Sequence, residues 1–189
     1  MDDLELLALA TAEFRRRLVD VDDEHMYLPT PCDDWNVAGL VSHVVGGNHM
    51  AVRLLDGAHR AEATGYLAGL PLGDDPVSTF DDGAAAQLAV LSEPGALDRV
   101  CEHPMGDFPG AMVLGFRIGD LTLHSWDLAR ATEGDEQLAP ELLDRVWASL
   151  EPIRDNIALS GVFGEGPSGA VGDDAPLQQR LLDLVGRRP

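Results

Sequence analysis

The sequence predicts an all-α fold: a four-helix bundle with extra short helices and one possible short extended segment. Apolar residues recur at spacings of three or four along several stretches of the chain. Capping residues and Gly or Pro mark where those stretches begin and end. One stretch is apolar nearly all round, which is typical of a helix at the centre of a bundle.

The first helix is expected over residues 2–19, where Leu4, Leu7, Phe14 and Leu18 recur at helical spacing. Arginines follow late in this segment, where cations complement the helix dipole. The turn-rich sequence TPCDDW comes next, and its proline favours an extended or turn conformation.

A second helix is expected over residues 37–55, with Asn36 as its cap. One stripe of this helix holds Leu40, His43, Gly47, Met50 and Leu54. His43 therefore points into an otherwise apolar face.

The later elements follow from Gly, Pro and capping signals. Residues 57–76 are expected to form a long connection, and Ser78 to cap a helix over residues 79–91. A short extended stretch and a turn are expected within residues 99–110. The remaining expectations are a central helix over 110–132, a helix over 140–151, a Gly-rich loop over 161–176 and a terminal helix over 177–185.

Length and composition favour one folded domain over residues 1–189. The chain has 189 residues, 45% of them hydrophobic, which suffices for a core without disulfide bonds. No internal repeat or domain boundary is visible. We expect a monomer or a homodimer.

The charge balance argues against two classes of partner. Thirty-three acidic and 13 basic residues give a net charge of -20, and every basic residue is an arginine. Such a surface repels phosphate backbones and anionic lipids, so neither nucleic acid nor membrane is an expected partner. The N-terminus lacks the features of an export signal. A cytoplasmic location is expected, with Cys32 and Cys101 as free thiols.

Asp120 and His124 form a D-x3-H pair on the expected central helix. Residues four apart on a helix share one face, so both side chains can bind one ion. The same spacing also occurs in plain hydrogen-bonded pairs. Asp120 lies between apolar residues, however, and a buried carboxylate is costly unless it is paired.

His43 is the candidate for a third ligand. A lone histidine on an apolar face is more often a core residue than a ligand. Here, however, both His43 and the D-x3-H pair place polar side chains on the two most apolar helices. A contact between these side chains across the bundle would explain both. Two histidines and one aspartate would leave a coordination position open, as in catalytic zinc sites. The alternatives are a metal-binding protein without catalysis and a polar cluster without metal.

The remaining candidates are interpreted as structural. Cys32 lacks a partner visible in the sequence, so catalysis by its thiol is not expected. Asp127 and Arg130 are expected to form an ion pair three residues apart. Trp35, Trp126 and Trp147 are expected in the core or in a pocket wall. The other histidines are expected to be solvated: His25, His49, His59 and His103.

Three stretches carry a family resemblance: TPCDDWNVAGLVSHVVGGNHM, DLTLHSWDLARAT, and the tail from SGVFGEGP to RLLDLVGRRP. They resemble the actinobacterial branch of the DinB-like superfamily, which includes mycothiol-dependent maleylpyruvate isomerase. The resemblance implies a four-helix bundle that binds a divalent metal. By motif, the implied ligands are His43, Asp120 and His124.

The resemblance also implies chemistry. It suggests an enzyme in which the ion activates a small thiol such as mycothiol for transfer to, or isomerisation of, a small electrophile. Zinc is the first choice of metal, with nickel, manganese or iron as alternatives. The isomerase has Glu where this chain has Asp120, and it has a second C-terminal domain for which residues 125–189 leave no room. The substrate of the isomerase is therefore not assigned to this chain.

Overall fold

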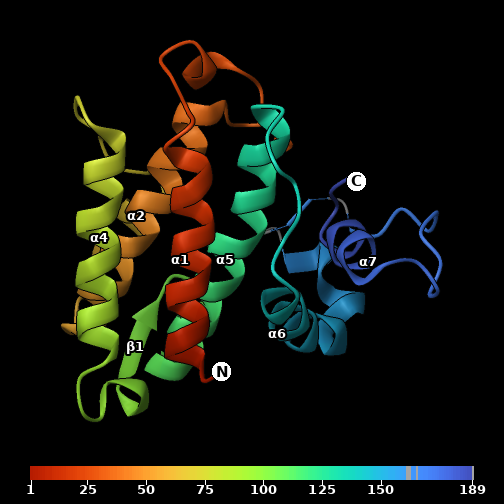
Figure 1. Ribbon diagram of the computed structural model, residues 1–189. Helices are drawn as coiled ribbons and strands as arrows, with labels where there is room; N and C mark the ends of the chain where they lie inside the picture. The colour runs from red at the N-terminus through yellow and green to blue at the C-terminus, as the bar shows by residue number, and fades with distance from the viewer. Residues whose placement is uncertain (161–162, 165, 189) are drawn as a thin grey trace.

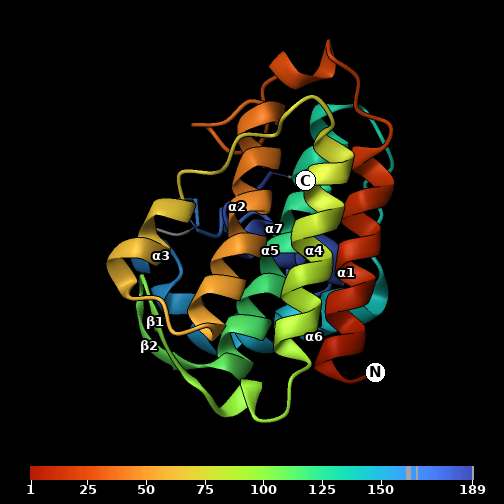
Figure 2. The ribbon, with the colours of Figure 1, turned by 90° about the vertical axis from the view of Figure 1, so that its left-hand side faces the viewer.

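Four long helices form the bundle in the computed structural model, which describes residues 1–160, 163–164 and 166–188. Helices α1 and α5 run in one direction, and α2 and α4 run in the other (Figures 1 and 2). Each pair of neighbours in the order α1, α5, α2, α4 is in contact, and α4 closes the ring against α1. The predicted all-α fold is confirmed. The bounds are α1 Asp3–Leu18, α2 Val37–Leu55, α4 Pro76–Leu91 and α5 Gly110–Ala131.

Side-chain caps fix where the bundle helices begin. Asp2 and Glu5 form a capping box on α1, in which each side chain accepts a hydrogen bond from the other's backbone N–H. The Asn36 side chain accepts a hydrogen bond from the N–H of Gly39, as expected for the cap of α2. These two helices therefore begin where the sequence predicts.

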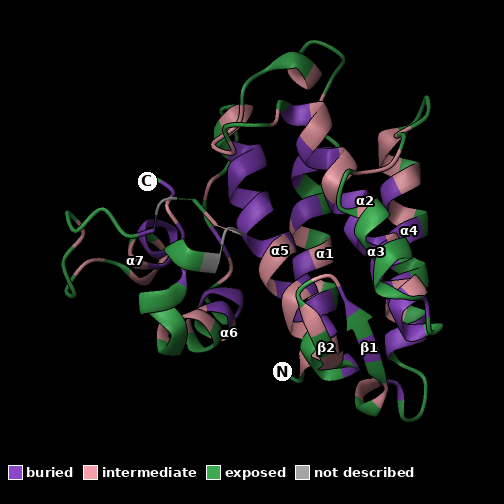
Figure 3. Cartoon of the chain, turned by 180° about the vertical axis from the view of Figure 1, so that it is seen from behind, coloured by how far each residue is buried: buried purple, intermediate pink, exposed green. Residues whose placement is uncertain are grey.

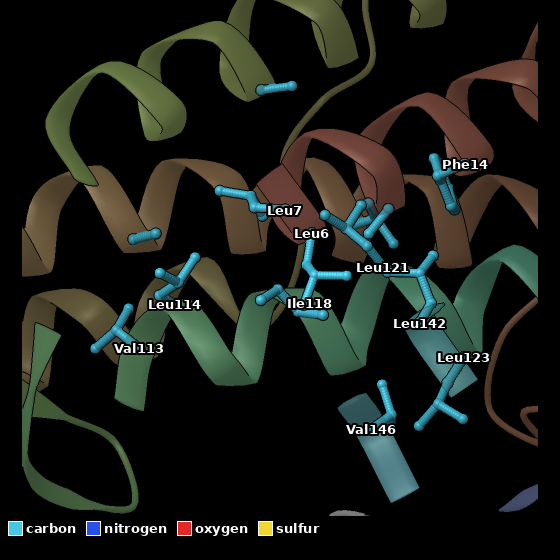
Figure 4. Packing of buried hydrophobic residues seen from close by; sticks show 14 of the residues in the cluster. Leu6, Leu7, Phe14, Val113, Leu114, Ile118, Leu121, Leu123, Leu142 and Val146 are labelled. Carbon is cyan, nitrogen blue, oxygen red and sulfur yellow. The ribbon is translucent and has the colours of Figure 1, made fainter. Parts of the chain in front are cut away.

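Helix α5 is largely buried, most of all in its C-terminal half, as Figure 3 shows. Its apolar side chains face two directions. Ile118 and Leu121 lie near Leu6 of α1, whereas Leu123 lies toward α6 (Figure 4). A helix apolar nearly all round is thus covered on both sides.

The smaller elements pack around the bundle. Strands β1 and β2 form the predicted extended segment, an antiparallel hairpin beside the N-terminal end of α5. Helices α6 and α7 lie against each other on the other side of α5 (Figure 1). The bounds are α3 Arg60–Tyr66, β1 Val100–His103, β2 Gly106–Pro109, α6 Pro140–Leu150 and α7 Leu177–Leu184, with 3-10 turns at His25–Tyr27, Ala96–Asp98, Glu151–Asn156 and Ala158–Ser160.

Two sequence-based expectations about residues 57–79 are wrong. The connection is not continuous loop, because helix α3 forms within it. Helix α4 begins at Pro76 and is capped by Asp75, whose side chain accepts from the N–H of Ser78. Proline suits the first turn of a helix, because its missing N–H would have no partner there.

The segment after α3 approaches helix α2 very closely. A Cβ on Gly46 would overlap the carbonyl oxygen of Tyr66, so only glycine fits at this point of α2. Ser42 anchors the same segment, because its hydroxyl donates to the carbonyl oxygen of Leu70 at 2.7 Å. This approach brings the carbonyl of Leu67 next to His43.

The C-terminal part of the chain agrees with the sequence where it is described. Helix α7 matches the expected terminal helix, and helix α6 begins at Pro140 as expected. Gly161, Val162 and Glu165, which belong to the expected Gly-rich loop, lie outside the described residues.

Candidate metal centre

The structure brings His43, Asp120 and His124 together between helices α2 and α5. Nε2 of His43 lies 3.2 Å from Oδ1 of Asp120, and Nε2 of His124 lies 3.4 Å from the same oxygen. The three ligand atoms all lie within 4.8 Å of one another. One imidazole comes from α2, and the D-x3-H pair comes from adjacent turns of α5.

A second contact holds the other polar atom of each candidate ligand. Nη1 of Arg117 donates to Oδ2 of Asp120 at 2.6 Å, which leaves Oδ1 facing the histidines. Nδ1 of His43 lies 3.5 Å from the carbonyl oxygen of Leu67. Such outer contacts fix the orientation of metal ligands in known sites.

His124 is held by a carboxylate one turn further along α5. Nδ1 of His124 donates to Oδ2 of Asp127 at 2.9 Å, so Nε2 is the nitrogen directed at Asp120. Asp127 is fully buried. Arg187, near the C-terminal end, donates to both carboxylate oxygens, through Nε to Oδ1 at 3.2 Å and Nη2 to Oδ2 at 2.8 Å. Arg187, Asp127 and His124 therefore form a continuous chain of hydrogen bonds.

Charge pairing dominates the electrostatics of the centre. Burial by itself disfavours the ionised form of Asp120, but the positive charges of Arg117, His43 and His124 outweigh it and hold the pKa well below its usual range. Burial likewise disfavours the imidazolium of His124. The carboxylates of Asp120 and Asp127 outweigh that effect and raise the His124 pKa well above its usual value.

Asp127 is ionised for related reasons. Burial opposes its ionisation, whereas the hydrogen bond from His124 and the charge of Arg187 favour it and lower its pKa to about 2. Asp127 therefore keeps its negative charge at neutral pH. It accepts a hydrogen bond from Nδ1 of His124, and the proton stays on the imidazole.

Arg117 connects the centre to a buried polar network in the bundle. Its guanidinium also donates to Oδ1 of Asn48 at 2.8 Å, Oε1 of Gln87 at 3.2 Å and the carbonyl oxygen of Val44 at 3.2 Å. Within the described chain, Nδ2 of Asn48 is the buried side-chain donor that lacks a hydrogen-bond partner. The network fixes the arginine that holds Asp120.

An aromatic wall borders the candidate ligands on one side. The ring of Trp35 stacks on that of His43 with centroids 4.4 Å apart, and its centroid lies 5.7 Å from that of His124. The side chains of His43 and Asp120 remain 16% and 23% exposed, so solvent reaches one edge of the centre. Trp35 was expected in the core or in a pocket wall, and it is partly buried and packed against the core.

Sequence reasoning missed the partners of Asp127. The expected pair of Asp127 and Arg130 does not form; Arg130 binds Glu136, and Asp127 binds His124 and Arg187. Asp127 points into the core, whereas Arg130 lies on the exposed side of the helix. The i, i+3 spacing of His124 and Asp127 was a usable signal for their contact. No local spacing could indicate Arg187.

Cys32 also lies beside this cluster. Its Sγ is 3.4 Å from Oδ2 of Asp127 and 3.6 Å from Nη2 of Arg187. Cys32, His124 and Asp127 therefore form a second group of possible metal ligands that shares His124 with the first. Arg187 already occupies both oxygens of Asp127, which favours the first group as the metal site.

The remaining histidines follow the expectation in part. His59 is exposed, and His25 and His49 are half-buried. His103 is buried, contrary to the expectation, because its ring packs against Phe108 and Phe116 beneath the β-hairpin. Cys32 and Cys101 are both free, as predicted.

Comparison with known families identifies this bundle. The sequence pattern of the mycothiol maleylpyruvate isomerase N-terminal domain matches residues 7–129, which include all three candidate ligands. The chain belongs to this family. Its mycothiol maleylpyruvate isomerase-like bundle thus covers α1 to α5, and α6 and α7 follow the matched region.

Relatives in sequence and structure extend the likeness. Two uncharacterized proteins of Mycobacterium tuberculosis, from strains ATCC 25618 / H37Rv and CDC 1551 / Oshkosh, are each 30% identical over 181 residues, covering 93% of this chain and 89% of theirs. The crystal structure of the mycothiol-dependent maleylpyruvate isomerase superposes with a TM-score of 0.61 at 18% identity. That match covers 78% of this chain and 68% of the isomerase. It establishes a shared fold. No described helix is long and apolar enough to cross a membrane.

Proposed function

We propose that His43, Asp120 and His124 hold one divalent metal ion, and that the protein uses it to activate a small thiol for reaction with a small electrophile. The observation that carries the proposal is the convergence of three ligand atoms within 4.8 Å, each on a side chain whose other polar atom is held elsewhere. Outer contacts of this kind orient the ligands in known metal sites.

The donor set fits a catalytic ion better than a structural one. Two imidazoles and one carboxylate supply three protein ligands, and a catalytic zinc site keeps its fourth position open. Zinc is the first choice, with nickel, manganese or iron as alternatives, because nitrogen and oxygen ligands discriminate poorly among these ions. Arg117 offsets the charge of Asp120, so a bound cation would keep more of its own charge for a thiolate.

Each residue of the centre has a distinct part in this chemistry. When bound, a divalent ion lowers the pKa of a thiol that coordinates it. Asp127 keeps the proton of His124 on Nδ1, so that Nε2 remains a ligand. Trp35 covers one side of His43 and narrows the approach of water. The exposed edges of His43 and Asp120 leave the path for thiol and electrophile.

Family membership supports mycothiol as the thiol, because the family takes its name from a mycothiol enzyme. The proposed electrophile is a small molecule. It either accepts the thiol group or is isomerised with the help of the thiol. Residues 1–189 would act as one functional unit in the cytoplasm, where thiols stay reduced.

The test begins with the metal. Protein purified without a His-tag should contain close to one divalent ion per chain, and His43→Ala and His124→Ala should lose it while His59→Ala, at an exposed position, keeps it. A metal-free protein under metal-replete conditions would overturn the proposal. Addition of mycothiol to cobalt-loaded protein should then give a thiolate-to-metal absorption band. A metal-loaded protein whose spectrum no thiol changes would favour a metal-binding role without thiol chemistry.

A further inference from the structure

The C-terminal end of the chain reaches the candidate metal centre through Arg187. Helix α7 is held in the core by Leu181, Leu182 and Leu184, which are all buried. Gly186 follows with a φ of +78°, a left-handed conformation that reverses the chain. The N–H of Arg187 then donates to the carbonyl oxygen of Leu182 at 2.9 Å, and its side chain turns toward α5.

Arg187 makes an enclosed two-pronged contact with Asp127. Its side chain is 9% exposed and that of Asp127 is 0% exposed. Because Nε and Nη2 each bind a different carboxylate oxygen, the carboxylate plane is fixed as well as its position. Nη1 donates to the carbonyl oxygen of Val185 at 3.1 Å, which holds the guanidinium from its other side.

The fixed carboxylate also accepts hydrogen bonds from Nδ1 of His124 at 2.9 Å and from Sγ of Cys32 at 3.4 Å, and the first of these contacts reaches a candidate ligand. Rotation of the Asp127 carboxylate would move Oδ2 and allow the imidazole to turn, which would carry Nε2 away from Asp120. The orientation of a ligand on α5 therefore depends on a residue 63 positions later in the sequence (187 minus 124).

We propose that Arg187 is a positioning residue of the metal centre, through which the C-terminal segment sets the geometry of the centre and the rate at which it releases metal. The proposal rests on the metal site proposed above. It assigns to Arg187 no contact with metal, thiol or electrophile.

The neighbouring arginine supplies a matched control. The side chain of Arg188 is 53% exposed, and its Nη1 lies 3.7 Å from Oδ1 of Asp183. Arg187→Met removes the guanidinium with little change in side-chain length, Arg187→Lys keeps the charge without the fork, and Arg188→Met makes the same change one residue later.

Cobalt-loaded protein gives the first readout. We expect Arg187→Met to release cobalt to a chelator roughly tenfold faster or more, with a changed d–d spectrum. The rate of cobalt release from Arg187→Lys should lie between the rates of Arg187→Met and wild type. Arg188→Met should release cobalt at the wild-type rate. The proposal would be overturned if both Arg187 variants released cobalt at the wild-type rate and kept the wild-type d–d spectrum. If Arg187→Met fails to fold, the Lys variant decides: intermediate release supports the proposal, and wild-type release refutes it.

A second readout needs no metal. The His124 Nδ1 proton should give a protected NMR resonance in metal-free wild-type protein and in Arg188→Met, and exchange rapidly in Arg187→Lys or Arg187→Met. If wild type binds no metal, the proposed function fails, whereas this resonance still shows whether Arg187 orients His124. Unchanged protection in the Arg187 variants would contradict the positioning role.

Discussion

Nδ1 of His124 donates a hydrogen bond to the buried carboxylate of Asp127 at 2.9 Å, and this contact decides which imidazole nitrogen faces Asp120. A histidine that binds metal commonly donates its second N–H to a carboxylate or a carbonyl, which fixes both tautomer and ring orientation.

Asp127→Asn should weaken metal binding without removing a ligand. The amide keeps nearly the same shape but loses the charge that holds His124 and Arg187, so metal affinity should fall roughly 10- to 100-fold. Competition with a chromophoric chelator measures this. Asp34→Asn, at an exposed position, should retain wild-type affinity. Equal affinities in the two variants would mean that Asp127 does not orient His124.

Metal binding should release a proton. The raised pKa of His124 favours the protonated imidazole in the metal-free protein, and Nε2 must lose its proton to become a ligand. Affinity should therefore rise with pH, by about tenfold per pH unit below the pKa of His124. Calorimetry in two buffers of different ionisation enthalpy counts the released protons. Binding without proton release would show that His124 is already neutral.

The metal-free protein should lose stability in acid partly through Asp127. Its pKa is 3.8 in the unfolded chain and about 2 in the folded protein. A lowered pKa contributes stability above 3.8 that disappears as the pH falls toward 2, and the contribution is about 2 kcal/mol. Urea unfolding should show the gap between wild type and Asp127→Asn narrowing over this interval. A gap independent of pH would contradict the assigned ionisation.

Gly47→Ala should disturb the centre by displacing Arg117, the partner of Asp120. A Cβ at this position would lie 2.6 Å from Cζ of Arg117, so the guanidinium must leave Asp120 and Asn48. The expected loss is about 3 kcal/mol of unfolding free energy, typical of a broken buried ion pair, together with weaker metal binding.

Gly119→Ala is the matched control for that substitution. No atom lies within 4 Å of its added Cβ, and alanine in place of a mid-helix glycine should stabilise α5 by about 0.5 to 1 kcal/mol. Thermal unfolding and metal content distinguish the two variants. Similar behaviour of both would imply that Arg117 relocates at no cost.

Cys32→Ala should retain wild-type metal content. The thiol lies beside Asp127, on the Nδ1 side of His124, whereas the proposed ion binds on the Nε2 side. Loss of metal in this variant would instead assign the ion to the group formed by Cys32, His124 and Asp127. Elemental analysis of untagged protein decides between the two groups.

Local signals in the sequence were sufficient for the bundle, and together with the family resemblance they selected the three candidate ligands. Asn36 caps α2 and places His43 on its face, and the four-residue spacing places Asp120 and His124 on one side of α5. Both depend only on residues within a few helical turns, where spacing along the chain translates directly into position in space. The role of these three residues as metal ligands stays a prediction.

The tertiary structure alone decided what surrounds those ligands. Helix α3 forms in a segment whose Gly and Pro content favoured a loop, and it brings Leu67 to His43. Asp127 pairs with Arg187 instead of Arg130, because a buried carboxylate takes the cation that packing brings to it, and Gly186 turns the last residues toward α5. Helical spacing determines which side chains share a face, whereas contacts between distant segments depend on how whole elements pack.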